Sequence, residues 1–121
     1  MNVAIVGASN DRSKFGNKAV RAYLKKGWRV FPVNPREAQI EGLKAFNSIS
    51  EMSERPDVVS VYLPPGVVLS VLDGIAKANA SLVYFNPGTE SAEVVEKARA
   101  LGIRFVLACS IRAIGENPED Y

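Results

Sequence analysis

The sequence contains no histidine and a single cysteine, Cys109. Histidine is the commonest general acid or base in enzymes and the commonest metal ligand, so its absence excludes a Ser-His-Asp triad or a Cys-His pair within this chain. A thiolate zinc site needs more than one cysteine, and no D-x-D cluster suggests carboxylate ligands, so we expect no metal site. A lone cysteine forms no internal disulfide, which favours a reducing compartment, the cytoplasm.

The sequence also lacks an apolar run near the roughly 18 residues of a membrane span, and Met1 leads directly into an apolar segment rather than a signal sequence. Its net charge is only +2, with Lys and Arg scattered along the chain, which argues against nucleic-acid binding. A length of 121 residues with 47% hydrophobic content suits one domain with its own core. We therefore expect a single domain, residues 1–121, that binds neither membrane nor nucleic acid; a homodimer or an unknown partner protein is left open.

Short apolar segments alternate with segments of helical periodicity. The apolar runs predict strands at 3–6, 29–33, 58–63, 82–85 and 104–108, with a short strand near 43–46. Apolar residues at helical spacing predict helices at 17–26, 68–75 and 91–101, with a short helix near 50–54. This alternation is typical of an α/β protein with a Rossmann-like, doubly wound parallel sheet of about five strands and helices on both faces. The polar residues 110–121 are expected to form a frayed tail.

Glycine, proline and asparagine gather directly after four of the predicted strands. "GASNDRSKFG" follows the first strand, "NPR" the second, "YLPPG" the middle strand and "FNPG" the fourth. Any one such cluster is ordinary turn chemistry. In an open parallel sheet, however, the carboxyl ends of the strands meet at one edge, where ligands bind. Four clusters at that edge therefore predict a ligand crevice.

The first cluster has the features of a phosphate-binding turn. Gly7 permits a sharp turn and close approach of a ligand. The backbone amides of 8–10 and 14–17, the hydroxyls of Ser9 and Ser13, the charge of Lys14 and the start of the next helix all favour an anion. Elsewhere, Pro64 and Pro65 form a stiff apolar wall. The residues Asn86, Pro87 and Gly88 predict a tight turn with an exposed amide, and Phe15 is either a core residue beneath the first turn or an adenine contact.

The turn lacks the G-x-G-x-x-G fingerprint of dinucleotide-binding proteins, and no acidic residue ends the second strand. Asn34-Pro35-Arg36 lies there instead. An arginine at this place suits an extra ribose phosphate, which both NADP and coenzyme A carry. The wall of Pro64 and Pro65 suits a thin pantetheine arm better than a nicotinamide ring, which favours coenzyme A and leaves NADP open.

The strings "VGASNDRSKFGNKAV", "GWRVFPVNPR", "IEGLKAFNSI", "VYLPPGVV" and "NPGTES" resemble, in order and spacing, the small stand-alone CoA-binding proteins. These are similar to the N-terminal CoA-binding domain of the succinyl-CoA synthetase alpha subunit, and the resemblance covers residues 2–110. It implies a Rossmann-like fold that binds CoA, free or acylated, at the carboxyl ends of its strands. The residues that it implies for binding are Gly7, Ala8, Ser9, Asn10, Ser13, Lys14, Phe15 and Gly16 for the pyrophosphate, Asn34, Pro35 and Arg36 for the ribose phosphate and adenine, and Tyr62, Leu63, Pro64, Pro65, Asn86, Pro87 and Gly88 for the remaining path.

The sequence departs from the family at two places: Asn86 replaces a glutamine or similar residue, and Tyr84 replaces a tryptophan. The synthetase reaction passes a phosphate through a histidine in another domain, which this chain lacks, so the resemblance implies CoA binding without catalysis. Two alternatives remain: an NADP-dependent or acyl-CoA-handling enzyme, and a redox protein in which Cys109 forms a mixed disulfide with CoA. The simpler interpretation of Cys109 is a small buried core residue. For Lys18, Arg21 and Lys25, the simpler interpretation is a helix face exposed to solvent.

Overall fold

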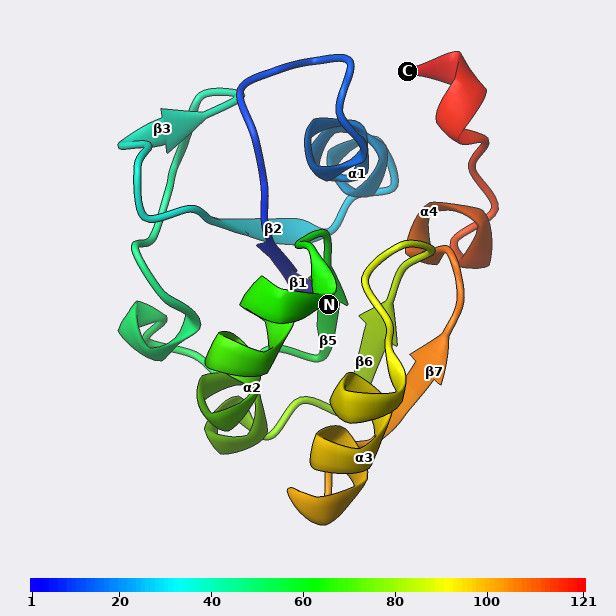
Figure 1. Cartoon of the computed structure of the whole chain (residues 1–121). Coiled ribbons are helices and arrows are strands. Elements are labelled where there is room, and N and C mark those ends of the chain that lie inside the picture. The colour runs from blue at the N-terminus through cyan, green and yellow to red at the C-terminus, as the bar shows by residue number, and fades with distance from the viewer.

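The computed structural model, which describes residues 1–121, contains a five-stranded parallel sheet in the order β2-β1-β5-β6-β7 (Figure 1). The interior strand β1 is buried along its whole length, as its apolar run predicts. The predicted α/β class with a Rossmann-like parallel sheet is confirmed. The strands are β1 (Asn2–Val6), β2 (Arg29–Val33), β5 (Val58–Val61), β6 (Leu82–Phe85) and β7 (Phe105–Leu107).

Helices cover both faces of this sheet (Figure 1). The helices α1 (Phe15–Lys25) and α4 (Ser110–Ala113) pack with one core cluster, which includes Tyr23 and Ile111. On the other face, α2 (Pro65–Ala78), α3 (Ala92–Ala100) and the 3-10 turn η1 (Ile49–Glu51) pack with a second cluster. No helix has both the length and the apolar character needed to cross a membrane.

The crossovers on either side of the sheet centre leave toward opposite faces. After β1 the chain enters α1 on one face and returns as β2; after β5 it enters α2 on the other face and returns as β6. The carboxyl ends of β1 and β5, which are neighbours in the sheet, therefore form the topological switch point, where open parallel sheets bind ligands.

The segment between β2 and β5 differs in detail from the prediction. Instead of one strand near 43–46, it forms a small antiparallel hairpin of β3 (Gln39–Ile40) and β4 (Leu43–Lys44). Glu41 and Gly42 make the turn, both with positive φ. A non-glycine residue at positive φ gives little sequence signal, which is why β3 was not predicted. The short helix expected near 50–54 is the 3-10 turn η1, one residue earlier.

The expectation of a frayed tail at 110–121 is wrong. Residues 110–113 form α4, and Pro118–Asp120 form a 3-10 turn, η2. Ser110 and Ile111 are fully buried, and Pro118 is buried as well. A few buried apolar residues are enough to hold a polar segment against the protein. These residues are buried because α1 lies next to them, and the composition of the segment does not reveal that neighbour.

Candidate functional site

Two glycines allow three chain segments to meet at the switch point. A Cβ atom on Gly7 would lie 2.2 Å from the Tyr62 carbonyl oxygen, and one on Gly16 would lie 2.2 Å from the Gly7 carbonyl oxygen. Gly7 also has φ +92°, which other residues rarely adopt. The ends of β1 and β5 and the start of α1 are thus in backbone contact. The direct need for Gly7 is this packing, rather than the ligand approach expected from the sequence.

The loop after β1 satisfies much of its own polarity. The Ser9 hydroxyl oxygen accepts a hydrogen bond from the Asp11 amide at 3.0 Å. The Ser13 amide and hydroxyl both donate to the Asp11 carboxylate, at 3.0 and 2.6 Å, and these bonds hold the pKa of Asp11 below its ordinary value. The Ser13 hydroxyl, predicted as a phosphate donor, is therefore already committed, and an ionised carboxylate lies in the loop. The first amides of α1, from Phe15 on, have no side-chain cap.

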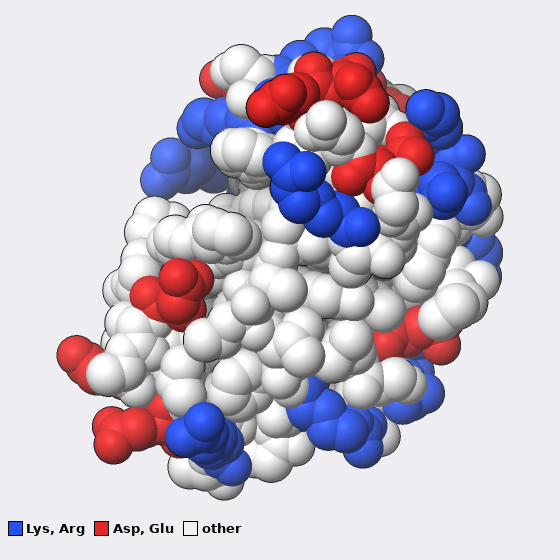
Figure 2. All heavy atoms as spheres, turned by 90° about the vertical axis from the view of Figure 1, so that its right-hand side faces the viewer, with Lys and Arg blue, Asp and Glu red and all other residues white.

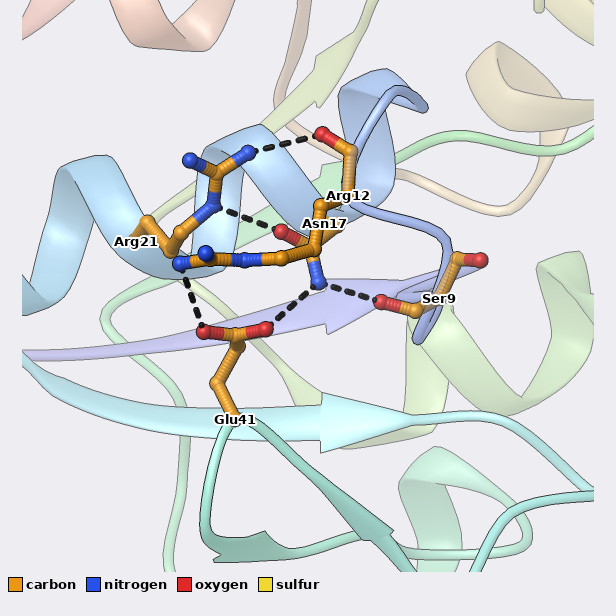
Figure 3. Close-up of polar contacts among 5 residues, drawn as sticks. All are labelled: Ser9, Arg12, Asn17, Arg21 and Glu41. Atoms are coloured by element: carbon orange, nitrogen blue, oxygen red, sulfur yellow. Dashed lines mark hydrogen bonds and ion pairs between the residues drawn. The ribbon is translucent and has the colours of Figure 1, made fainter. Parts of the chain in front are cut away.

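A network of side chains fastens this loop to the β3–β4 hairpin (Figure 3). The fully buried Asn17 donates to the Ser9 carbonyl at 2.8 Å and to the Glu41 carboxylate at 3.0 Å. Arg21 donates to the Asn17 side-chain oxygen and to the Arg12 carbonyl, both at 2.7 Å. Arg12 in turn forms an ion pair with Glu41 at 3.3 Å. The loop is therefore held in place by side chains of α1 and of the turn between β3 and β4.

The basic residues of α1 do not form the uniformly solvated face that the sequence predicts. Arg21 belongs to the network above, and Lys25 forms an ion pair with Glu116 at 3.2 Å. The Lys18 ammonium lies 5.3 Å from the centre of the Phe15 ring, which is 55% exposed. Phe15 is thus not a core residue, which leaves the ligand contact as its predicted role. Lys14 is exposed and has no salt-bridge partner.

A cavity of about 570 Å³ opens at the carboxyl edge of the sheet, beside the start of α1. This volume is within the range of small-molecule sites. Half of the predicted binding residues line it: Phe15, Gly16, Tyr62, Leu63, Pro64, Pro65, Asn86, Pro87 and Gly88. The sequence interpretation missed five lining residues: Lys18, Thr89, Arg112, Pro118 and Glu119. Thr89 directly follows the predicted turn and could have been included, whereas the last three belong to the segment expected to be frayed.

Cys109 lines the same cavity and is half-buried, with a free thiol. The expectation of a buried core residue is therefore wrong. Cys109 directly precedes α4, at the carboxyl edge of the sheet, where the chain leaves the core. Arg112, in α4, also lines the cavity; its side chain is exposed and has no salt-bridge partner.

The polar side chains beneath the cavity are turned inward. Burial raises the pKa of Tyr62 to about 12, so its hydroxyl stays protonated at neutral pH, and its oxygen lies 3.1 Å from the Ser110 hydroxyl oxygen. The Asn86 side chain is 2% exposed and hydrogen-bonded within the protein. The Asn86 side-chain amide is therefore directed into the protein, because its hydrogen-bond partners lie on β5.

A second cavity, of about 270 Å³, lies between the ends of β1 and β2, η1 and α2. Its lining includes Val33, Pro35, Ser48 and Val67. Leu63 lines both cavities, so the two are neighbours separated by that side chain.

The remaining predicted residues line neither cavity: Gly7, Ala8, Ser9, Asn10, Ser13, Lys14, Asn34 and Arg36. Ala8 is fully buried, so its side chain is inaccessible to a ligand. Asn34 donates to the Ala8 carbonyl at 2.9 Å and accepts from the Arg36 amide at 2.8 Å, which joins the ends of β1 and β2. Asn10 donates to Glu37 and to the Gln39 carbonyl. The Arg36 side chain is exposed and has no salt-bridge partner.

Comparison with known proteins gives a consistent family. The sequence model described as the CoA binding domain matches residues 1–114. The alpha subunit of an ADP-forming acetate–CoA ligase II from Pyrococcus furiosus is 30% identical in an alignment of 115 residues that covers 86% of this chain and 25% of that protein. The chain thus spans about a quarter of that relative's length.

Solved structures agree with this result. A conserved hypothetical protein from Pyrococcus furiosus superposes with a TM-score of 0.85 at 34% identity, covering 93% of this chain and 97% of that one. A dinucleotide-forming acetyl-coenzyme A synthetase 1 from Ca. Korarchaeum cryptofilum, in complex with phosphate and ADP, superposes with a TM-score of 0.77 at 31% identity over 88% of this chain and 25% of that one.

Proposed function

Because this chain belongs to the CoA binding domain family, we propose that it binds coenzyme A, free or acylated, without catalysing a reaction of its own. One observation carries the proposal. The cavity of about 570 Å³ lies at the switch point between the uncapped start of α1 and the apolar wall of Pro64 and Pro65. This combination suits a molecule with a diphosphate next to a long uncharged arm.

Such a ligand would lie along residues of both cavities. The free amides at Phe15 and Gly16, with Lys14 and Lys18 nearby in sequence, would hold the diphosphate. The pantetheine arm would lie along the cavity lining from Tyr62 to Pro65 and end beside Pro87 and Gly88.

The second cavity would take the adenine. It is lined partly by Val33 and Pro35, and Ser48 supplies a polar group at its wall. Arg36, which follows Pro35 and has no salt-bridge partner, would meet the ribose phosphate. Two carboxylates work against an anionic ligand: Asp11 in the loop, and Glu119 at the cavity wall. Both are exposed, so water and salt screen their repulsion.

A binding role without catalysis is supported by the lack of histidine, the commonest general acid or base. We propose that the chain acts in the cytoplasm as a CoA carrier, a sensor or a partner subunit; a free cysteine suits that compartment. The homodimer left open by the sequence stays a prediction, to be measured by sedimentation.

Calorimetric titration of ligand-stripped protein with CoA, dephospho-CoA and NADP tests the proposal. We expect CoA to bind with a dissociation constant well below about 1 mM, corresponding to more than about 4 kcal/mol. Dephospho-CoA should bind less tightly, and NADP least. Tighter binding of NADP than of CoA would support the alternative of a nicotinamide-dependent enzyme, and the absence of CoA binding would refute the proposal.

A second candidate function rests on Cys109, which lines the cavity where the thiol end of CoA would lie. Its thiolate would attack CoA disulfide, forming a Cys109–S–S–CoA bond and releasing one CoA thiol. Intact mass after exposure to CoA disulfide should then increase by one CoA moiety, and the Cys109→Ser variant should keep its mass. An unmodified wild-type mass would exclude this function while leaving reversible CoA binding untouched.

A further inference from the structure

The cavity rests on a largely buried polar cluster whose hydrogen bonds the sequence motifs do not predict. Its centre is Asn86, which is 2% exposed and directly follows β6. The Asn86 side-chain amide donates to the Ser60 hydroxyl and to the Val61 carbonyl, both at 2.9 Å. Its side-chain oxygen accepts from the Ser110 amide at 2.8 Å. Both amide hydrogens and one lone pair are thus used inside the protein, and none of these three bonds goes to the cavity.

Ser110 extends the cluster to the cavity wall. It is fully buried, and its hydroxyl oxygen lies 2.6 Å from the Ser60 hydroxyl oxygen and 3.1 Å from that of Tyr62. The Thr89 hydroxyl donates to the Asn86 carbonyl at 2.7 Å. We call Ser60, Tyr62, Asn86, Thr89 and Ser110 the Asn86 cluster. No buried side-chain nitrogen or oxygen of the protein lacks a partner, so the cluster is fully satisfied.

This cluster joins three segments that are far apart in sequence and that wall the cavity. Ser60 and Tyr62 come from the end of β5, Asn86 and Thr89 from the turn after β6, and Ser110 from the start of α4. Tyr62, Thr89 and Cys109, the neighbour of Ser110, line the cavity. A satisfied network in a poorly solvated place is rigid, because loosening one member leaves the others unpaired at a cost.

The cluster also determines what the wall presents to a ligand. The Tyr62 hydroxyl is held by the buried Ser110, so it is directed into the protein, and the rest of that wall is formed by Leu63, Pro64 and Pro87. An apolar wall of fixed shape suits the uncharged pantetheine arm, because the arm then loses little binding energy to reordering of the protein.

We propose that Asn86 and Ser110 are positioning residues for ligand binding: they hold the three walls of the cavity in one arrangement without contacting the ligand through their side chains. This inference rests on the proposed CoA function. It assigns Asn86 a role different from the direct contact that the sequence predicts. A purely structural cluster would lower the stability when broken but leave the affinity of the remaining folded protein unchanged.

The chain offers a matched control at the opposite end of the sheet. Asn2 begins β1, is 9% exposed, donates to Glu54 at 3.1 Å and accepts from the Asp57 amide at 2.6 Å. Like Asn86, it is a buried asparagine that bridges distant segments. It lies at the amino ends of the strands, away from both cavities.

The test compares CoA affinity in Asn86→Ala and Asn2→Ala, with thermal unfolding of each, at a temperature where both are folded. We expect Asn86→Ala to weaken CoA binding at least about tenfold and Asn2→Ala to change it less than about twofold, although both lower the unfolding temperature. If the two variants bind CoA with the same affinity, whether unchanged or reduced, the positioning role is refuted. If Asn86→Ala does not fold, Ser110→Ala replaces it; this variant keeps the amide bond to Asn86 and removes only the hydroxyl.

A second readout needs no CoA and separates the failure of this inference from the failure of the proposed function. In the ligand-free protein, the rate at which Cys109 reacts with a thiol reagent reports the mobility of the wall. Asn86→Ala and Ser110→Ala should raise that rate several-fold, while Asn2→Ala should not. Unchanged rates would contradict the inference even if wild-type protein binds CoA. Raised rates with no CoA binding by wild type would contradict the proposed function alone.

Discussion

Gly16 and Gly66 differ in what surrounds them, although both are the second residue of a helix. A Cβ on Gly16 would lie 2.2 Å from the Gly7 carbonyl oxygen, whereas a Cβ on Gly66 meets nothing within 4 Å. The first position closes the switch point and the second is open surface. The sequence marks both as glycine and does not distinguish these roles.

This difference predicts opposite effects of the same substitution. Gly16→Ala should lower the free energy of unfolding by about 2 kcal/mol or more, because the backbone at Gly7 must shift. Gly66→Ala should be neutral or raise it by up to about 1 kcal/mol, since alanine has the better helix propensity. Urea unfolding of the two variants measures both. A similar loss in each would mean that the contact with Gly7 does not control the fold of the turn.

Arg36 tests the ribose-phosphate assignment. Its side chain is exposed and has no salt-bridge partner, so removing it should leave the stability within about 0.5 kcal/mol. Arg36→Ala should weaken CoA binding by about 1–3 kcal/mol while barely changing the binding of dephospho-CoA. The reason is that Arg36 would contact the ribose phosphate, which dephospho-CoA lacks. Arg99→Ala, an exposed arginine on α3, is the control. Equal losses for the two ligands would place the ribose phosphate elsewhere.

At the scale of elements, the segment from 114 to 121 is attached to α1 by charge and aromatic contacts. Glu116 forms an ion pair with Lys25 and accepts a hydrogen bond from the Tyr121 hydroxyl. The Tyr121 ring also lies 5.6 Å from the Arg21 guanidinium carbon. Through Pro118 and Glu119 the segment lines the larger cavity, so its attachment shapes the proposed site.

The docking of this segment should depend on pH in a defined direction. The Tyr121 hydroxyl and Lys25 hold the pKa of Glu116 below its ordinary value of 4.5, so the contribution of Glu116 is present above that value and is lost as the pH falls through the lower folded pKa. Glu116 raises the pKa of Lys25 above 10.5, so the contribution of Lys25 is lost only as the pH rises through that raised value.

Nuclear magnetic resonance of the Tyr121 ring measures this docking. Its chemical shift should move toward that of a free tyrosine as the pH falls through the lowered pKa of Glu116, and Glu116→Gln should remove most of this acid transition. If the Glu116→Gln variant shows an acid transition of the same size, the transition belongs to another carboxylate, such as Asp120, which is next to Tyr121 in sequence.

For the whole molecule, charge is distributed without one dominant sign. On the face that Figure 2 shows, acidic and basic side chains lie close together at the upper end, while the middle carries few charges. The net charge is +2. Attraction of an anionic ligand must therefore come from a few local cations, such as Lys18 and Arg112 at the cavity, rather than from the field of the entire protein.

This predicts a moderate salt dependence of CoA affinity. CoA carries about four negative charges, and the Debye length falls from about 10 Å at 0.1 M to about 3 Å at 1 M ionic strength. The dissociation constant should therefore rise several-fold between about 0.05 M and about 0.5 M salt. Pantetheine, which has no phosphates, should bind weakly with no such dependence. A salt-independent dissociation constant for CoA would mean that apolar contacts alone hold it.

The sequence by itself determined the sheet, its parallel character and the edge at which the larger cavity opens, because strand periodicity and the Gly, Pro and Asn residues after each strand are local signals. It also singled out Tyr62 to Pro65, which line that cavity. Only the tertiary structure decided that Asn86 faces inward and that residues 110–121 complete the cavity wall. These outcomes depend on partners 24 to 50 residues away or on packing against α1, and no local pattern encodes which of several polar groups will meet when the chain folds.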